Sequence, residues 1–392
     1  MHTPLPLGFS TSSTACGIKG DPARPDLSLF VSDRDCTAVG VFTTNRVVGA
    51  PVKVCRERVP QTAARSVIIN AGNANACTGE RGLDDARWMT AEVAQGLKCR
   101  AEQVLVASTG VIGRFLPREK LAAGIPRVLG TLSPSPESFH GVARAMMTTD
   151  TVPKQASRVI IGEGGQEVTL SGVCKGAAMI APNMATMLCV IMTDAALAPD
   201  QADKALRAAM SESFHCISID QHQSTSDTVL LLANGAAGVA SPQLFQTALN
   251  EVCSELAQKI VRDAEGASHF VTLDVTGLED RQAAERIARA VCDSPLVKTA
   301  ITGNDPNWGR IVSAAGYAGV PFEEHEVSLT INGLKVFHQG APTTVPVEDV
   351  SAQMKTGEIH MVLEFTRGNA AVRYWTCDLT TEYVRLNADY TT

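Results

Sequence analysis

The sequence has few of the features that mark secreted, membrane-bound or metal-dependent proteins. Its 11 cysteines contain no CxxC pair and its 8 histidines no HExxH motif, so neither a disulfide framework nor a zinc site is predicted. No apolar run is long enough to cross a bilayer, and the first residues, MHTPLPLGFSTSST, lack a basic segment followed by an apolar one. We therefore expect a cytoplasmic protein with free thiols, no membrane contact and no metal.

An excess of positive charge is also absent. The chain has 34 Lys and Arg against 41 Asp and Glu, a formal net charge of -7, which supplies no basic surface for DNA or RNA. Neither GNANACTG at 72–79 nor NDPNWGR at 304–310 has the spacing of a P-loop or of a GxGxxG fingerprint. No nucleic-acid partner and no cofactor is predicted.

What the chain does have is the length and patterning of a layered α/β protein. Its 392 residues, 45% of them hydrophobic, allow two domains or one large body with a smaller lobe. A change of pattern near residue 275 divides the chain into a main catalytic body, 1–275, and a smaller α/β lobe, 276–392, whose C-terminal tail is expected to return to the active site. Hydrophobic periodicity and turn residues predict helices at 84–99, 135–149, 245–260 and 284–291, strands at 27–31, 38–42, 66–70 and 271–275, and hairpins around GEGG at 162–165 and Asn332-Gly333.

One segment stands out for chemistry. KGAAMIAPNMATML, at 175–188, predicts a loop that enters a buried strand at 187–192, with Thr186 at the strand start. A threonine there is by itself an ordinary β-branched strand residue. It becomes a candidate nucleophile because Lys175 stands eleven residues upstream and a Ser-Thr-Gly turn is predicted at 108–110.

The segment resembles the self-processing site of ornithine acetyltransferase, the glutamate N-acetyltransferase of arginine biosynthesis, whose KGxxMIAPNMAT stretch is cut before its threonine. The resemblance spans nearly the whole chain. It includes GVFTTNRVVGAPV at 40–52, INAGNANACTG at 69–79, STGVIG at 108–113, MMTTDTVPK at 146–154, VRDAEGAS at 261–268 and KTAITGNDPNWGRI at 298–311.

The family's fold is an αββα sandwich, and its members are cleaved, here between Ala185 and Thr186, into fragments 1–185 and 186–392. By resemblance these fragments stay associated and pair further into a homo-oligomer. Thr186 would be the nucleophile, and its new α-amino group, titrating near 8, a suitable base for the hydroxyl. The resemblance further implies Thr109 and Gly110 for oxyanion stabilisation and Thr149, Lys175, Thr186, Glu265, Asn387 and Thr392 for substrate binding.

The implied reaction moves the acetyl group of N2-acetyl-L-ornithine onto Thr186 and then onto L-glutamate. Many relatives also take acetyl-CoA as donor, and the residues do not separate the two kinds. Gln221 and His222 stand where the family usually has Gly and Asp, and Ser226 where it has Asn. A self-processed aminopeptidase or amidase, and an amino-acid-binding protein that never cleaves, are the alternative interpretations.

Overall fold

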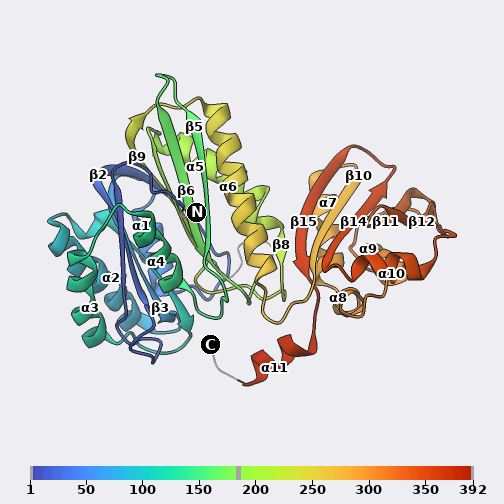
Figure 1. Cartoon of the computed structure of the whole chain (residues 1–392), viewed down its shortest axis with the longest axis horizontal. Helices are drawn as coiled ribbons and strands as arrows, with labels where there is room; N and C mark the ends of the chain where they lie inside the picture. Colours follow the sequence, from blue (N-terminus) through green and yellow to red (C-terminus); the bar gives the residue numbers. More distant parts are fainter. Residues whose placement is uncertain (1–2, 182–186, 390–392) are drawn as a thin grey trace.

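The computed structural model describes residues 3–181 and 187–389, and two mixed β-sheets organise this part of the chain (Figure 1). The first sheet has the order β4-β3-β2-β9-β7-β6-β5, with β1 beside β2. Its strands are β1 (Phe9–Thr14), β2 (Leu27–Phe42), β3 (Gln61–Asn73), β4 (Val104–Val111), β5 (Lys154–Ile161), β6 (Glu167–Lys175), β7 (Leu188–Ala195) and β9 (Thr228–Gly238).

A bend in the long strand β2 folds the first sheet onto itself. The pairing of β2 with β3 shifts register between Val31 and Cys36, where the chain is exposed. The half of β2 before this bend pairs with β1 and β3. The half after it pairs with β9, while Cys36 and Ala38 still pair with the start of β3. Leu29 from one half and Leu230 from the other belong to the same hydrophobic cluster, so the two halves of the sheet pack together.

Helices cover both outer faces of this folded sheet. α1 (Ala50–Arg58), α2 (Gly79–Leu97) and α3 (Arg118–Gly130) pack with the half that contains β3 and β4, whereas α5 (Pro199–Ser211) and α6 (Pro242–Arg262) pack on the half that contains β5 to β9. α4 (Pro136–Met146) contacts strands of both halves. The layers therefore run helix, sheet, sheet, helix, in agreement with the expected α/β class.

Strand β7 lies at the centre of this arrangement. All of its residues are buried, between β6 on one side and the parallel strand β9 on the other. Leu188 and Val190 face the cluster between the two halves of the sheet, and Cys189 and Ile191 face α6 and its neighbours. The predicted buried strand is confirmed, whereas residues 182–186 of the predicted loop before it lie outside the described residues.

The second lobe is built on the sheet β13-β12-β11-β14-β10-β15-β8. The chain leaves the first lobe after α6 and enters this sheet at Phe270, so the predicted boundary at residue 275 lies within β10, and the division into domains stays a prediction. Its elements are β8 (Ile217–Ser218), β10 (Phe270–Leu278), β11 (Val327–Ile331), β12 (Leu334–His338), β13 (Ala341–Pro342), β14 (Glu358–Phe365), β15 (Ala370–Cys377), α7 (Arg281–Asp293), α8 (Pro295–Thr302), α9 (Trp308–Gly316) and α10 (Val347–Met354).

Local signals in the sequence account for several element ends. The Ser135 hydroxyl accepts the N–H of Ser138 at 3.2 Å and begins α4, and Asp280 accepts the N–H of Ala283 at 2.7 Å and begins α7. Such N-caps satisfy backbone donors that the helix itself leaves free. The GEGG sequence joins β5 to β6 in an antiparallel hairpin, and Asn332-Gly333, both with positive φ, join β11 to β12.

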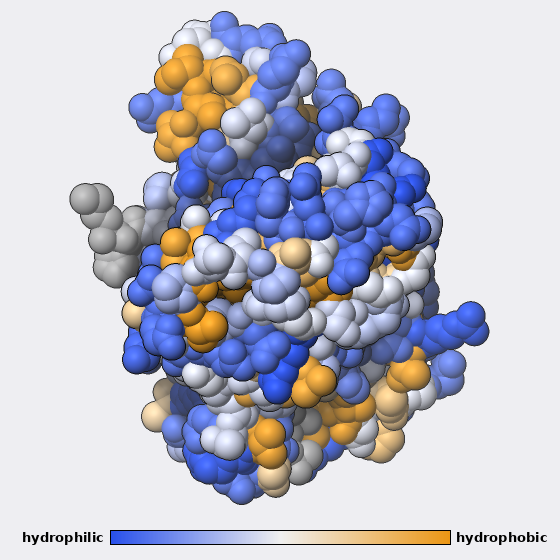
Figure 2. All heavy atoms as spheres, turned by 90° about the vertical axis from the view of Figure 1, so that its right-hand side faces the viewer, coloured by the Kyte–Doolittle hydropathy of each residue, from blue (hydrophilic) through white to orange (hydrophobic). Residues whose placement is uncertain are grey.

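The face of the molecule at the right of Figure 1 is mostly hydrophilic, with separate small hydrophobic groups (Figure 2). Apolar side chains of the second lobe such as Leu273, Leu329 and Leu363 instead lie in a cluster shared with α6. Within residues 3–181 and 187–389, no helix is long and apolar enough to cross a membrane.

Candidate active site

A pocket of about 570 Å³ lies where β4, the end of β6, the residues before β9 and the C-terminal helix α11 (Thr381–Asp389) meet. α11 reaches it by running back from the second lobe towards the first (Figure 1). The predicted site residues on the pocket wall are Thr109, Gly110, Thr149, Lys175, Glu265 and Asn387. Ala185, Thr186 and Thr392 lie outside the described residues.

Lys175, the last residue of β6, is the buried cation of the pocket. Its side chain is 3% exposed, and Nζ donates to Thr109 Oγ1 at 3.2 Å. Burial lowers the pKa of this ammonium group, while the carboxylate of Asp150 acts in the opposite direction. A poorly hydrated ammonium group loses little solvation when it binds an anion, so Lys175 is suited to hold a carboxylate.

The Ser-Thr-Gly segment lies in strand β4, and the predicted turn at 108–110 is wrong. Asn70 to Gly72 of β3 pair with these residues in parallel register. Gly110 has φ +127°, and a Cβ there would lie 2.3 Å from the carbonyl carbon of Gly72. Glycine is therefore required by the close approach of two strands and by a positive φ, not by a turn.

Glu265 supplies negative charge across the pocket. It follows α6, its backbone N–H donates to the Ala177 carbonyl oxygen at 2.9 Å, and its Oε2 accepts the side-chain amide of Asn387 at 3.0 Å. Glu265 is 8% exposed although it carries a carboxylate. Helix α11 thus positions the Glu265 carboxylate. Glu265 precedes the strands β10 to β15 in the chain and Asn387 follows them, yet their side chains meet at one site.

Asp220 is a pocket residue that the sequence did not single out. Its carboxylate accepts the backbone N–H groups of Met179 and Ile180 at 2.6 and 2.8 Å, and the Tyr383 hydroxyl at 3.1 Å. The segment that leads toward the Ala185–Thr186 junction is therefore tied to α11. Asp220 directly precedes Gln221 and His222, where the sequence departs from the family pattern, and this was a signal for it, but Tyr383 had no local signal.

Behind Lys175 lies an ion cluster that sequence reasoning also missed. Lys154 Nζ contacts Asp150 Oδ1 at 2.7 Å and Asp263 Oδ2 at 2.5 Å, and all three side chains are at most 5% exposed. Burial alone would raise the pKa of the Asp150 carboxyl, but Lys175 and Lys154 bring it to about 2. The Asp150 carboxylate also accepts the N–H of Gly176 at 2.7 Å, which holds the backbone next to Lys175.

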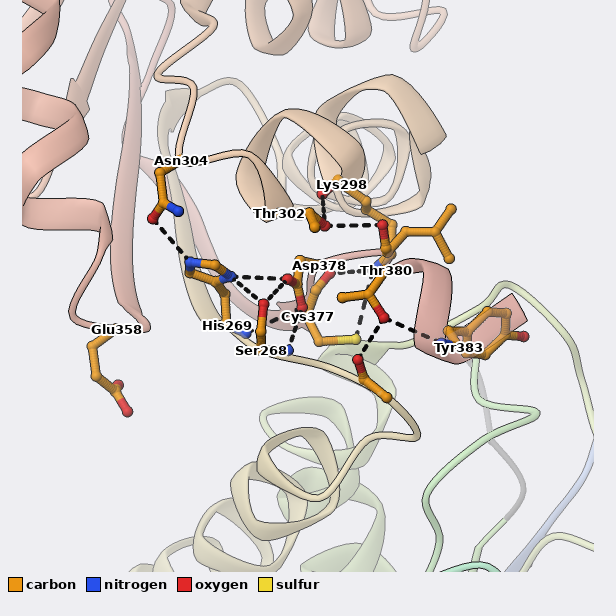
Figure 3. A network of polar contacts seen from close by, with 12 residues as sticks. Ser268, His269, Lys298, Thr302, Asn304, Glu358, Cys377, Asp378, Thr380 and Tyr383 are labelled. Atoms are coloured by element: carbon orange, nitrogen blue, oxygen red, sulfur yellow. Dashed lines mark hydrogen bonds and ion pairs between the residues drawn. The ribbon is translucent and has the colours of Figure 1, made fainter. Parts of the chain in front are cut away.

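The two chain segments that join the lobes are held together by the network in Figure 3. Asp378, after β15, accepts the backbone N–H groups of Ser268 and His269 at 2.9 and 3.1 Å and meets His269 Nδ1 at 2.8 Å. The other ring nitrogen of His269 faces Asn304 Oδ1 at 3.2 Å. Because the Ser268 hydroxyl and Asp378 both meet Nδ1, the three residues do not form a Ser-His-Asp relay, in which serine and aspartate contact opposite ring nitrogens.

The departures from the family pattern lie on the pocket wall or beside it. Gln221 has φ +64° and donates to the Asp293 carbonyl oxygen. A left-handed backbone favours glycine, the residue that the resemblance predicts at this position. His222 and Ser226 both line the pocket.

Within residues 3–181 and 187–389, no group of three or more His, Cys, Asp or Glu side chains is arranged to hold a metal ion. All 11 cysteines are free thiols. The groups that face the pocket are instead hydroxyls, amides, carboxylates and amines, which suit acid, base and nucleophilic chemistry.

Comparison with known proteins gives a consistent result. A family model described as "ArgJ family" matches residues 10–392. The chain is 43% identical over 397 residues to the arginine biosynthesis bifunctional protein ArgJ of Rhodopirellula baltica, covering 99% of this chain and 96% of that protein. It is 41% identical over 402 residues to the protein of the same name from Thermotoga neapolitana, covering 99% and 100%. The crystal structure of a Bacillus halodurans protein of that name is similar with a TM-score of 0.50 and 35% identity, over 51% of this chain and 98% of that one.

Proposed function

The chain belongs to the ArgJ family, and on that premise we propose that it transfers the acetyl group of N2-acetyl-L-ornithine to L-glutamate through an acetyl ester on Thr186. It is an acyltransferase of arginine biosynthesis, an ornithine acetyltransferase, and the word "bifunctional" in its relatives' names implies amino-acid N-acetyltransferase activity as well. The observation that carries the proposed mechanism is the meeting of Lys175, Thr109 and Glu265 at one pocket.

The charges of the pocket support an amino-acid substrate. Lys175 and Glu265 present a cation and an anion to the same cavity. An N-acetylated amino acid with a second amino group needs both, because its carboxylate pairs with an ammonium group and its free amino end with a carboxylate. We assign these contacts to Lys175 and Glu265, with Thr149, Asn387 and Thr392 completing the substrate site.

The contact between Lys175 and Thr109 supports an oxyanion role for Thr109. An ammonium group can only donate hydrogen bonds, so Thr109 Oγ1 accepts from Lys175. The Thr109 hydroxyl hydrogen is then left to donate to a developing oxyanion, together with the N–H of Gly110. One such preorganised donor is typically worth about 3–4 kcal/mol in the transition state.

The proposed reaction has two acyl transfers at one hydroxyl. Thr186 Oγ attacks the acetyl carbonyl carbon of acetylornithine, its proton passes to the leaving amine, and ornithine departs. The amine of glutamate then attacks the acetyl ester and restores the threonine hydroxyl. Acetyl-CoA is included as a second donor, which would load Thr186 in the same way and release CoA.

Thr186 becomes an N-terminal nucleophile, in our proposal, when the bond to Ala185 breaks. The Bacillus halodurans chain aligns over 98% of its own length but over only 51% of this chain, which supports a fragment of about half length. Strand β7, just after Thr186, is buried between β6 of the first fragment and β9 of the second. Cleavage would therefore leave the two fragments associated, and by resemblance to the family we expect this unit to pair into a homo-oligomer.

The test is incubation with acetylornithine labelled in the acetyl group, with and without glutamate. We expect labelled N-acetylglutamate to form only when glutamate is present, and the purified protein to consist of two fragments. Release of labelled acetate independent of glutamate would contradict the transferase and favour an aminopeptidase or amidase. A single uncleaved chain of 41.4 kDa that turns nothing over would favour a binding protein.

Replacing Asp378 with asparagine is expected to weaken substrate binding more than catalysis. Asparagine presents an NH2 group where the two carboxylate oxygens now accept four hydrogen bonds from Ser268 and His269. The segments that carry Glu265 and α11 should loosen. We expect KM for acetylornithine to rise about 10-fold, equivalent to about 1.4 kcal/mol, with kcat changed much less, as measured by steady-state kinetics.

Glu382→Gln is the matched control, because Glu382 lies on the same helix α11 and pairs with the exposed side chain of Arg385. Its KM should equal that of the wild type. A fall in kcat at unchanged KM in Asp378→Asn would show that the network acts on the chemical step instead.

A further inference from the structure

Asp227, immediately before β9, is a fully buried carboxyl that the reaction described above does not use. It is 0% exposed and follows the pocket residues Ser224 to Ser226. Its Oδ1 accepts the backbone N–H of Met187 at 3.1 Å. Its Oδ2 is buried and has no hydrogen-bond partner within residues 3–181 and 187–389.

An opposing charge, the ammonium group of Lys175, acts on Asp227. Burial raises the pKa of this carboxyl to about 7, while the Met187 N–H, the hydroxyls of Thr43 and Ser224 and the ammonium group of Lys175 act to lower it. The Thr43 hydroxyl itself donates to the Ser224 carbonyl oxygen at 2.6 Å. The lowering by Lys175, from β6, is smaller than the effect of burial, so the carboxyl is partly protonated near neutral pH.

The position of Asp227 places it beside the cleavage junction. The nitrogen of Met187 belongs to the peptide bond that follows Thr186, so the carboxylate is anchored one peptide unit from that residue. The Met187 N–H binds Oδ1, and the other oxygen of the carboxylate, Oδ2, is the one without a partner in the described part of the chain. A buried acceptor without a donor is costly, so this Oδ2 beside Met187 calls for an explanation.

The mechanism described above supplies no base for the first step of self-cleavage. In the mature enzyme the α-amino group of Thr186 can act as the base for its own hydroxyl, but before cleavage that nitrogen is an amide and cannot accept a proton. The first acyl shift therefore needs another base near Thr186. A general base is most effective when its pKa lies near the working pH.

We propose that Asp227 is the proton acceptor for self-cleavage, a step that rests on the proposed function of Thr186. Asp227 Oδ2 takes the proton of the Thr186 hydroxyl as Oγ bonds to the Ala185 carbonyl carbon. The bond from that carbon to the Thr186 nitrogen breaks, and Asp227 returns the proton to the nitrogen, which becomes the free amine. Water then hydrolyses the ester, which restores the Thr186 hydroxyl and leaves a carboxyl group on Ala185.

The test follows cleavage of the newly synthesised full chain by intact-mass spectrometry over a range of pH. Because the base must be unprotonated, the wild-type rate should rise about tenfold per pH unit below pH 7 and level off above it. Asp227→Asn, which keeps an oxygen for the Met187 N–H, should cleave at least about 100-fold more slowly and without this pH dependence. Above pH 7, the midpoint of thermal unfolding of Asp227→Asn should not fall below that of the uncleaved Thr186→Ala chain. The reason is that a neutral amide replaces a carboxylate whose charge is disfavoured by burial.

Asp194→Asn is the matched control. Asp194 is also a buried carboxyl and lies on β7, but its two oxygens accept the N–H groups of Leu7 and Thr169 at 2.9 and 2.7 Å. It should cleave at the wild-type rate. Normal cleavage in Asp227→Asn, or a wild-type rate independent of pH between 5.5 and 8, would overturn the role of Asp227 alone. A wild-type chain that never cleaves would instead overturn the proposed function of Thr186.

Discussion

Thr186→Ala is expected to remain a single chain of 41.4 kDa and to transfer no acetyl group. Alanine has no hydroxyl, so neither the attack on the Ala185 carbonyl nor the acetyl ester can form. Because one atom serves both steps, the two losses should occur together. Intact-mass spectrometry of the purified variant measures the first loss, and labelled acetylornithine with glutamate measures the second.

Thr186→Ser is the control that separates the hydroxyl from the rest of the side chain. Serine keeps the oxygen and loses only a methyl group, so we expect two fragments and measurable transfer. Fragments in the Thr186→Ala variant would show that another residue is the nucleophile. Transfer by an uncleaved Thr186→Ala chain would show that the acetyl group does not pass through residue 186.

Lys154→Met is expected to lower the free energy of unfolding by about 3–5 kcal/mol, because removal of one partner leaves the others as uncompensated buried charges. Lys154 lies between Asp150 and Asp263, and all three side chains are excluded from water. Methionine fills similar volume but supplies no charge. Urea unfolding of the variant and the wild type at pH 7 measures the difference.

The loss of stability in Lys154→Met should become smaller at low pH. The pKa of Asp150 in the folded protein is about 2, below its usual value of 3.8. Its stabilising contribution is therefore complete above about pH 4 and is lost as the pH falls through 2. The difference between Lys154→Met and the wild type should shrink over that interval.

Arg207→Met is the control for the loss of a positive charge as such. Arg207 pairs with Asp203 at 2.8 Å on α5, but its side chain is 61% exposed. Exposed pairs of this kind contribute about 0.3–0.5 kcal/mol. An equal loss in the two variants would show that burial does not decide the strength of the Lys154 cluster.

Several parts of the fold could be predicted because their signals are local. The hydroxyl of Ser135 and the carboxylate of Asp280 satisfy backbone donors three residues away, and Asn332-Gly333 adopts positive φ whatever surrounds it. The bend of β2 was not predictable in this way. The sequence suggested two separate strands there, whereas the structure has one strand, Leu27–Phe42, whose two halves belong to facing layers.

The candidate site also has parts that could be predicted from the sequence and parts that could not. Thr109 and Lys175 could be named from their motifs, but their contact at 3.2 Å joins residues 66 positions apart. The segment 108–110 was expected to be a turn, because glycine is common in turns, whereas the approach of Gly72 and the positive φ of Gly110 explain the glycine. Asp220 and Asp227 had no motif role, since what distinguishes them is which backbone N–H groups they accept and which oxygen is left without a partner.

By itself, the sequence determined the family and the mixed α/β class and predicted Thr186 as the nucleophile, because these depend on residue types in a fixed order along the chain. Only the tertiary structure decided what surrounds the pocket: Lys175 against Thr109, Asn387 against Glu265, and Lys154 between Asp150 and Asp263. The physical reason is that charge pairing, burial and hydrogen bonding depend on distances in space. Those distances are set here by a folded sheet and by a last helix that returns to the first lobe.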